Sequence, residues 1–103
     1  MPNRGPLKAT CGDLKKLMAE LPPPRDLKEA EDDEDRLRIK MMATIHGRIG
    51  ETVAALQAED EEGTVVFSIE EMDEILDCMP PPPTLTAVRE KLGDLRRQTL
   101  EGA

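Results

Sequence analysis

Apolar residues recur at helical spacing in four stretches of the chain, and each stretch ends near prolines or a charged run. Steps of three and four residues place apolar side chains on one face of a helix. The sequence therefore predicts four amphipathic helices, over about residues 11–21, 26–57, 69–79 and 84–100. The predicted fold class is all-α, a small bundle with one long helix and proline-rich connectors.

The segments between these stretches set the expected boundaries. Residues 1–9 carry two prolines and one glycine, which predicts an irregular N-terminal arm ahead of a single helical domain over residues 10–103. Prolines at 22–24 and 80–83 end the first and third helices, because proline lacks the backbone donor and clashes with the preceding turn. Residues 65–67 are compatible with a short extended segment.

The clearest local signal is at the start of the third helix. Ser68 and Glu71 have the spacing of a capping box, in which each side chain accepts a hydrogen bond from the other residue's backbone. Phe67 and Met72 flank this box as a hydrophobic staple. Weaker capping candidates precede the other three helices: Thr10, Asp26 and Thr84.

The longest predicted helix carries an apolar stripe that little of the remaining chain is free to cover. From Met42 to Leu56, the positions on this stripe alternate in steps of three and four residues, the spacing of a helix seam. Gly47 and Gly50 are small enough to permit close approach of a second backbone. We therefore expect this face to dock onto a partner through the following residues: Leu37, Met41, Met42, Ile45, Ile49, Val53 and Leu56.

The expected core is thin. The chain of 103 residues has one aromatic residue, Phe67, and no Trp or Tyr. Methionine fills irregular gaps in cores and is also common at adaptable binding surfaces, so both roles stay open for Met41, Met42, Met72 and Met79. We expect partner binding or self-association to add stability to so small a core.

Negative charge is concentrated in the middle of the chain. The formal net charge is −8, and residues 29–79 carry sixteen Asp or Glu against four Lys or Arg. Such a segment disfavours direct binding to phosphate backbones and to anionic membranes, which both need basic residues. The predicted acidic surface has two clusters, Asp32, Asp33, Glu34 and Asp35 in the second helix and Glu70, Glu71, Asp73 and Glu74 in the third.

A calcium loop is the most specific metal site that the sequence suggests. Residues 59–67 look like the middle of an EF-hand loop between two helices. That loop needs a glycine at position 6 and ligands at positions 1 and 12. With Gly63 at position 6, the end positions are Ala58 and Ile69, and Glu70 is one residue late. A solvated acidic connection is the preferred interpretation.

Other catalytic and metal chemistry has little support. Cys11, His46 and Cys78 are the only soft ligands and are far apart, whereas structural zinc takes four ligands in close pairs. Neither cysteine has neighbours that resemble an activated nucleophile. The chain also lacks a Gly-rich phosphate loop, a GxSxG elbow and a HExxH pair. We predict no metal, no cofactor and no catalytic residues.

The two proline runs have two interpretations. Each could dock into an SH3- or WW-type groove as a polyproline II ligand, and the first is followed by Arg25. Each could instead be a stiff spacer between helices. We prefer the spacer, because compositional signals of this kind are weak.

The expected setting is intracellular, and cytoplasmic in the absence of another signal. Two cysteines are few for a disulfide-stapled secreted domain, so both are expected to be free thiols. The N-terminus has no apolar leader segment. No stretch approaches the roughly 18 apolar residues of a membrane span.

These observations favour a non-enzymatic protein that binds another protein, as a small subunit or adaptor that docks an apolar helix face. A hetero-complex is the preferred arrangement, and a homo-oligomer stays open. The alternative is an acidic decoy that inhibits a basic protein by occupying its nucleic-acid-binding site, since spaced carboxylates can imitate phosphates. Direct contact with nucleic acid or membrane is not expected.

Overall fold

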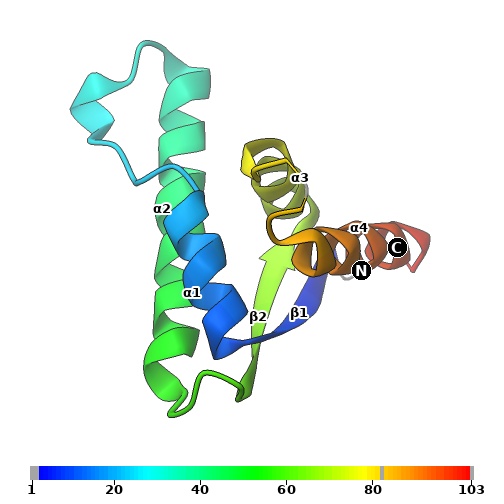
Figure 1. The fold of residues 1–103 in the computed structure, drawn as a ribbon. Helices are drawn as coiled ribbons and strands as arrows, with labels where there is room; N and C mark the ends of the chain where they lie inside the picture. The colour runs from blue at the N-terminus through cyan, green and yellow to red at the C-terminus, as the bar shows by residue number, and fades with distance from the viewer. Residues whose placement is uncertain (1–2, 82, 103) are drawn as a thin grey trace.

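The chain folds around a two-stranded sheet with helices packed against it. The computed structural model describes residues 3–81 and 83–102. Within them the elements are β1 (Arg4–Thr10), α1 (Cys11–Glu20), the 3₁₀ turn η1 (Leu27–Glu29), α2 (Asp33–Ala55), β2 (Glu62–Ser68), α3 (Ile69–Cys78) and α4 (Thr86–Glu101). Figure 1 shows the two strands between α2 and α4. The predicted all-α fold class is therefore wrong, because the fold is helix-rich but mixed.

Much of the predicted irregular arm, residues 1–9, is strand β1 instead. β1 pairs antiparallel with β2, with Arg4 opposite Ser68 at one end and Thr10 opposite Glu62 at the other. The pairing joins the start of the chain to its second half, so no local pattern indicates it. The alternation of apolar and polar residues within β1 is also faint. Its three inward positions are Gly5, Leu7 and Ala9, and two of them, the glycine and the alanine, are very small.

Side chains protect both outer edges of the sheet. Arg48 Nη1 of α2 donates to the Val66 carbonyl oxygen of β2 at 3.1 Å. Lys91 Nζ of α4 donates to the Lys8 carbonyl oxygen of β1 at 3.3 Å. Pro6 lies two residues from Lys8 in β1, so the backbone N and O atoms of both residues point to the outer side of the sheet. The missing N–H of Pro6 therefore removes no hydrogen bond between the strands. Proline and charged side chains at an edge hinder pairing with a further strand.

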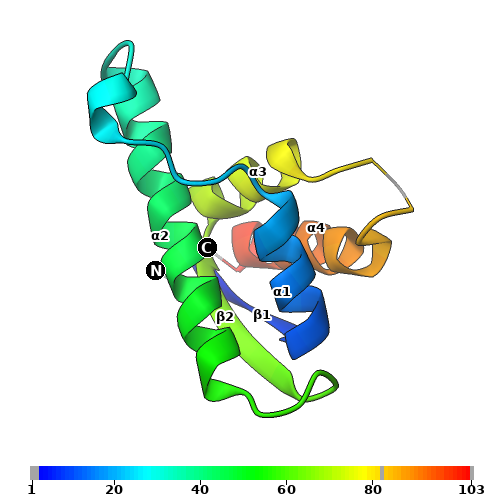
Figure 2. The same ribbon diagram turned by 60° about the vertical axis from the view of Figure 1, so that its left-hand side comes forward.

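Two glycines set how closely the helices approach the sheet. Figure 2 shows α2 alongside β2. A Cβ atom at Gly63 of β2 would lie 2.7 Å from Thr52 Cγ2 of α2. A Cβ atom at Gly5 of β1 would lie 2.7 Å from Leu95 Cδ1 of α4. Both positions therefore need glycine for these contacts. The inner face of the sheet is buried beneath the helices: Leu7, Ala9, Val65 and Phe67.

The long helix is shorter than the sequence predicted. α2 spans Asp33–Ala55 rather than about 26–57. It begins where the Asp32 side chain accepts a hydrogen bond from the Asp35 backbone N–H at 2.8 Å. Aspartate is among the preferred residues at this position of a helix. Several aspartates in the acidic run have the same capability, so the pattern alone did not locate the start.

Residues 21–32 run alongside the first half of α2. From here on we call this segment the arm; it is distinct from the irregular N-terminal arm predicted over residues 1–9. The arm and the first turns of α2 project beyond the other helices (Figures 1 and 2). Asp26 caps η1 by accepting a hydrogen bond from the Lys28 backbone N–H at 3.0 Å. His46 Nε2 lies 2.8 Å from the Pro22 carbonyl oxygen, and donates to it in the tautomer protonated at Nε2. The first proline run thus connects α1 to α2 while one side of it contacts α2.

The start of α3 follows the predicted capping, and the start of α4 does not. Ser68 Oγ accepts from the Glu71 N–H at 3.1 Å, and Glu71 Oε1 accepts from the Ser68 N–H at 2.7 Å, which confirms the capping box. Thr84 was expected to cap the last helix. Instead α4 begins after Leu85, which has a left-handed backbone (φ 54°) and no side-chain cap. Burial of the Leu85 side chain in the core offsets the strain of this conformation.

Candidate functional site

The predicted docking seam on α2 lies mostly in the protein's own core. Ile45 and Ile49 have no exposed surface, and Met42 is also buried. Three further members are partly buried against the same core: Met41, Val53 and Leu56. Leu37 is the exception, with 64% of its surface exposed. A partner would reach Ile45 or Ile49 only if the fold opened, because α1, β2 and α3 already contact α2.

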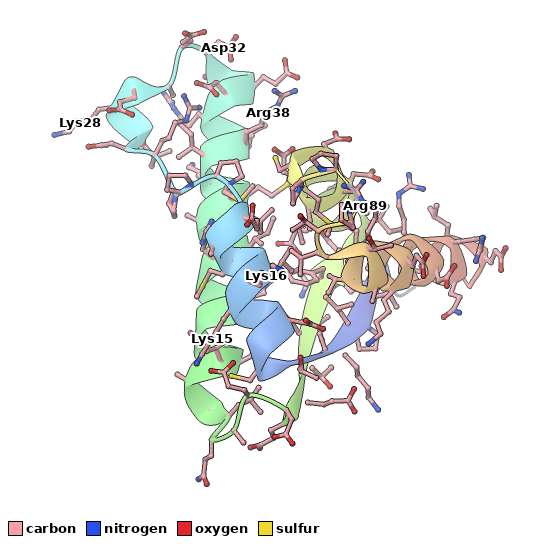
Figure 3. The ribbon with its side chains drawn as sticks, viewed as in Figure 1. Lys15, Lys16, Lys28, Asp32, Arg38 and Arg89 are labelled. Atoms are coloured by element: carbon pink, nitrogen blue, oxygen red, sulfur yellow. The ribbon has the colours of Figure 1, made fainter. Side chains whose placement is uncertain are left out.

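The first predicted acidic cluster lies at the projecting end of α2, where Figure 3 shows Asp32. Asp32, Asp33 and Glu34 are exposed. Asp33 lies 3.9 Å from Arg36 and Glu34 lies 3.6 Å from Arg38, measured from carboxylate oxygen to guanidinium nitrogen. Exposed pairs of this kind contribute only about 0–1 kcal/mol to stability. They do make this end of the helix less negative than its carboxylates alone suggest.

The second predicted acidic cluster, on α3, is divided between surface and interior. Glu70 is exposed, and Glu74 is partly buried. Asp73 forms an ion pair with Arg96 of α4. Glu71 is 7% exposed and does not belong to the surface, because it accepts the capping-box hydrogen bond and forms an ion pair with α2.

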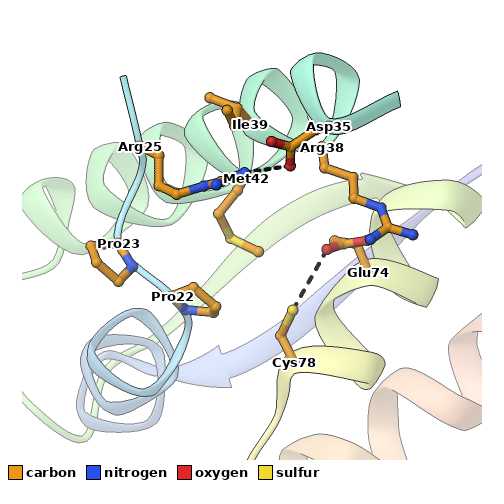
Figure 4. Close-up of a pocket in the computed structure, with 9 residues that line it drawn as sticks. All are labelled: Pro22, Pro23, Arg25, Asp35, Arg38, Ile39, Met42, Glu74 and Cys78. Atoms are coloured by element: carbon orange, nitrogen blue, oxygen red, sulfur yellow. Dashed lines mark hydrogen bonds and ion pairs between the residues drawn. The ribbon is translucent and has the colours of Figure 1, made fainter. Parts of the chain in front are cut away.

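A hollow lies where the arm, α2 and α3 meet, and we call it the arm groove (Figure 4). Its volume is about 200 Å³. Met42 of α2 and Cys78 of α3 point into it from opposite sides. Ile39 adds apolar surface from α2, and Pro22 and Pro23 form the wall on the side of the arm. Segments from three separate parts of the sequence therefore build one partly apolar hollow.

Charged residues of both signs complete the lining of the groove: Arg25, Asp35, Arg38 and Glu74. Arg25 of the arm forms an ion pair with Asp35 of α2, and the Glu31 backbone N–H donates to Asp35 Oδ2 at 3.1 Å. The hydrogen bond from Glu31, assisted by the Arg25 guanidinium, lowers the pKa of the Asp35 carboxyl below its usual value. Asp35 therefore fastens the arm to α2 at two points.

The Cys78 thiol in the groove is not activated. Cys78 Sγ lies 3.6 Å from Glu74 Oε1, within reach of a weak hydrogen bond. Burial, together with the negative charge of Glu74, raises the pKa of the Cys78 thiol. The thiolate is the nucleophilic form, and this environment disfavours it. Cys11, the other cysteine, is buried. The groove is therefore suited to contact rather than to thiol chemistry.

The metal sites considered from the sequence do not form among the described residues. The segment that looks like a calcium loop runs into β2, where Gly63 lies opposite Ala9. Residues 3–81 and 83–102 contain no group of three or more His, Cys, Asp or Glu that is arranged to hold a metal ion.

Sequence reasoning did not identify the arm groove. Of its lining residues, only Met42, Asp35 and Glu74 were among the predicted site residues, and the first proline run was interpreted as a spacer. The one available signal was that Arg25 directly follows that run and that Asp35, in the acidic start of the next helix, comes ten positions later. A separation of that kind does not specify a contact, because the connecting segment has many possible paths.

No protein-family model matches the chain, and we found no match among curated proteins or among solved structures. Among the helices of the described residues, none is long and apolar enough to cross a membrane.

Proposed function

We propose that the protein acts by binding another protein, and that the arm groove receives a side chain of this partner. The size and lining of the groove carry the proposal, namely about 200 Å³ with apolar surface from Ile39 and Met42 and a charged rim. Small-molecule sites usually measure about 300–1,000 Å³. Protein interfaces, in contrast, combine small pockets for single anchor side chains with a polar rim.

An exposed aliphatic side chain on the arm adds to this support. Leu27 in the arm is 43% exposed, and Leu37 in the first half of α2 is 64% exposed. Helical spacing places Leu37 on the face of α2 opposite the groove residues Asp35, Ile39 and Met42, so it does not border the groove. A partner that enters the groove and also covers the arm would gain apolar contact from Leu27.

The acidic decoy has weaker support than protein binding through the groove. Imitation of phosphates needs carboxylates whose charge is uncompensated. Three of the four carboxylates of the first cluster, Asp33, Glu34 and Asp35, each form an ion pair with an arginine, which leaves Asp32 alone without one among the described residues. We therefore base the proposed function on the groove, in place of both the acidic cluster and the α2 seam.

Two substitutions at one position test the proposal. Cys78→Phe places a ring in the groove, whereas Cys78→Ser leaves the groove open. The unsubstituted protein and both variants are immobilised and used to capture proteins from a native extract, after thermal unfolding by circular dichroism has shown that all three are folded. We expect a stoichiometric partner on the unsubstituted protein and on Cys78→Ser, and at least about tenfold less of it on Cys78→Phe.

Two results would contradict the proposal. Equal capture by all three proteins would show that the partner does not use the groove. Failure of the unsubstituted protein to retain any stoichiometric partner would argue against protein binding as its function.

A further inference from the structure

We infer that the segment entering the arm groove is a basic one, in which an aliphatic side chain fills the hollow and Lys or Arg residues lie close to it in sequence. The inference rests on the proposed function of the groove. It goes further by naming the chemistry of the partner segment, first from the space in the groove and then from the charges around it.

The space in the groove suits one aliphatic side chain. A dry cavity of about 150 Å³ in a protein core accepts a group the size of benzene. The groove has about 200 Å³ and is partly open, so it has room for one Leu, Ile or Met side chain. Met42, which points into it, has a flexible thioether chain that adapts to the shape of what it contacts.

The two arginines of the groove already have anionic partners. Arg25 forms an ion pair with Asp35, and Arg38 lies 3.6 Å from Glu34. Figure 4 shows Arg25 turned toward Asp35. Each arginine thus has a carboxylate of the protein beside it, which reduces its attraction to an acidic partner.

The wall formed by α3, in contrast, has negative charge to spare. α3 carries five carboxylates and no Lys or Arg. Glu71 and Asp73 are compensated by arginines of α2 and α4. Glu74 lines the groove, where Figure 4 shows the Arg38 side chain turned toward it. Neither Glu74 nor Asp77, however, forms an ion pair with any of the residues that the structure describes.

The outer end of the groove is negative as well. Asp35 and Arg38 also line a second hollow of about 180 Å³, together with Glu31, Asp32 and Glu34. Among the described residues, Glu31 and Asp32 have no cationic partner. Uncompensated carboxylates thus lie both on the α3 side and on the arm side of the apolar hollow. A basic segment complements both, whereas an acidic one would be repelled.

The test uses a random peptide library displayed on phage, selected against the full-length protein. Selected peptides are synthesised with a fluorescent label, and their affinity is measured by anisotropy at low and high NaCl. Three variants are compared with the unsubstituted protein. Cys78→Phe fills the groove, and Glu74→Lys reverses the charge of its wall. Glu90→Lys makes the same change at an exposed position of α4 as the matched control.

We expect the selected peptides to share an aliphatic residue with at least two Lys or Arg within a few positions of it. Their affinity should fall at least about tenfold in Cys78→Phe and in Glu74→Lys, and should change little in Glu90→Lys. It should also weaken as NaCl screens the charges.

The outcomes separate the inference from the proposed function. Peptides that lose binding in Cys78→Phe but are neutral or acidic would overturn the basic partner and leave the groove as the binding site. A selection that yields no peptide sensitive to Cys78→Phe, with a protein that also does not self-associate through the groove, would overturn both. Self-association that Cys78→Phe abolishes, without any selected peptide, would overturn only the inference, by making a second copy the occupant.

Discussion

Arg48 of α2 and Glu71 of α3 form the most buried ion pair among the described residues, with Arg48 Nη1 at 2.5 Å from Glu71 Oε1. The same Glu71 oxygen accepts the Ser68 backbone N–H at 2.7 Å, and the same Arg48 nitrogen donates to the Val66 carbonyl oxygen at 3.1 Å. One contact therefore joins α2, the outer edge of β2 and the first turn of α3. A capping box is a local motif, but here its glutamate also fixes the packing of two helices.

Substitutions at Glu71 should separate these two roles. Glu71→Gln keeps a side chain that is able to complete a capping box but removes the charge, and we expect a loss of about 1–2 kcal/mol in the free energy of unfolding. Glu71→Ala removes the cap as well, and should lose about 1 kcal/mol more. Urea denaturation measures both. Glu70→Gln, at the exposed neighbouring position, should stay within about 0.5 kcal/mol. Equal stability of the two glutamine variants would contradict the role of the ion pair.

Two glycine-to-alanine substitutions should change stability in opposite directions. At Gly63, the new methyl group would lie 2.7 Å from Thr52 Cγ2, and we expect a loss of about 1–3 kcal/mol from overpacking. At Gly47, inside α2, a Cβ atom has no neighbour within 4 Å. Gly47→Ala should therefore gain up to about 1 kcal/mol through helix propensity. Thermal and urea unfolding measure both effects.

A double variant provides the control for Gly63. Thr52→Ser removes the Cγ2 methyl group that the alanine would meet, so Gly63→Ala should cost less in the Thr52→Ser background than in the unsubstituted protein. An equal cost in both backgrounds would mean that the close approach of α2 to β2 is not what requires glycine.

The attachment of the arm should weaken in acid. Because Asp35 has a lowered pKa in the folded protein, its contribution is fully present above the ordinary carboxyl value of 3.8 and is lost as the pH falls through the lower folded value. The carboxyl carbon NMR signal of Asp35 should therefore titrate with a midpoint below 3.8, and the Glu31 amide, which donates to Asp35, should lose its protection from hydrogen exchange over the same pH range. Asp35→Asn should remove the protection of the Glu31 amide at every pH. A midpoint for Asp35 well above pH 4 would contradict the lowered pKa.

The thiol of Cys78 should react slowly at neutral pH. Burial and the charge of Glu74 raise its pKa above the ordinary 9.0, so the rate of alkylation by iodoacetamide should have a midpoint above that pH. The measurement uses a Cys11→Ser background, which leaves one thiol. Glu74→Gln should move the midpoint down toward the ordinary value, and unfolding in urea should accelerate the reaction at pH 7. A midpoint below that of the unfolded protein would contradict the structure of the groove.

Features that the sequence could predict were those set by neighbouring residues. The observed ends of α1 and α3 are within one residue of the expected ones. Prolines stop both helices, and the Ser68–Glu71 capping box starts α3. The apolar stripe of α2 was also recognisable, since spacing alone decides which side chains share a helix face. What the stripe packs against was not recognisable. The structure buries Ile45 and Ile49 in the protein's own core, and α1, β2 and α3 contact α2.

Features that only the tertiary structure decided are those that join distant segments. β1 has little apolar signal of its own and becomes a strand because β2 supplies its hydrogen bonds, with Gly5 and Gly63 admitting the helices that cover both. The arm groove likewise exists only where the first proline run, the start of α2 and the end of α3 meet. A sequence pattern reports the face that a segment buries. Which other segment covers that face depends on long-range packing. Its free energy includes the entropy of closing the intervening loop and the fit between the two surfaces, and neither can be read from a short stretch of sequence.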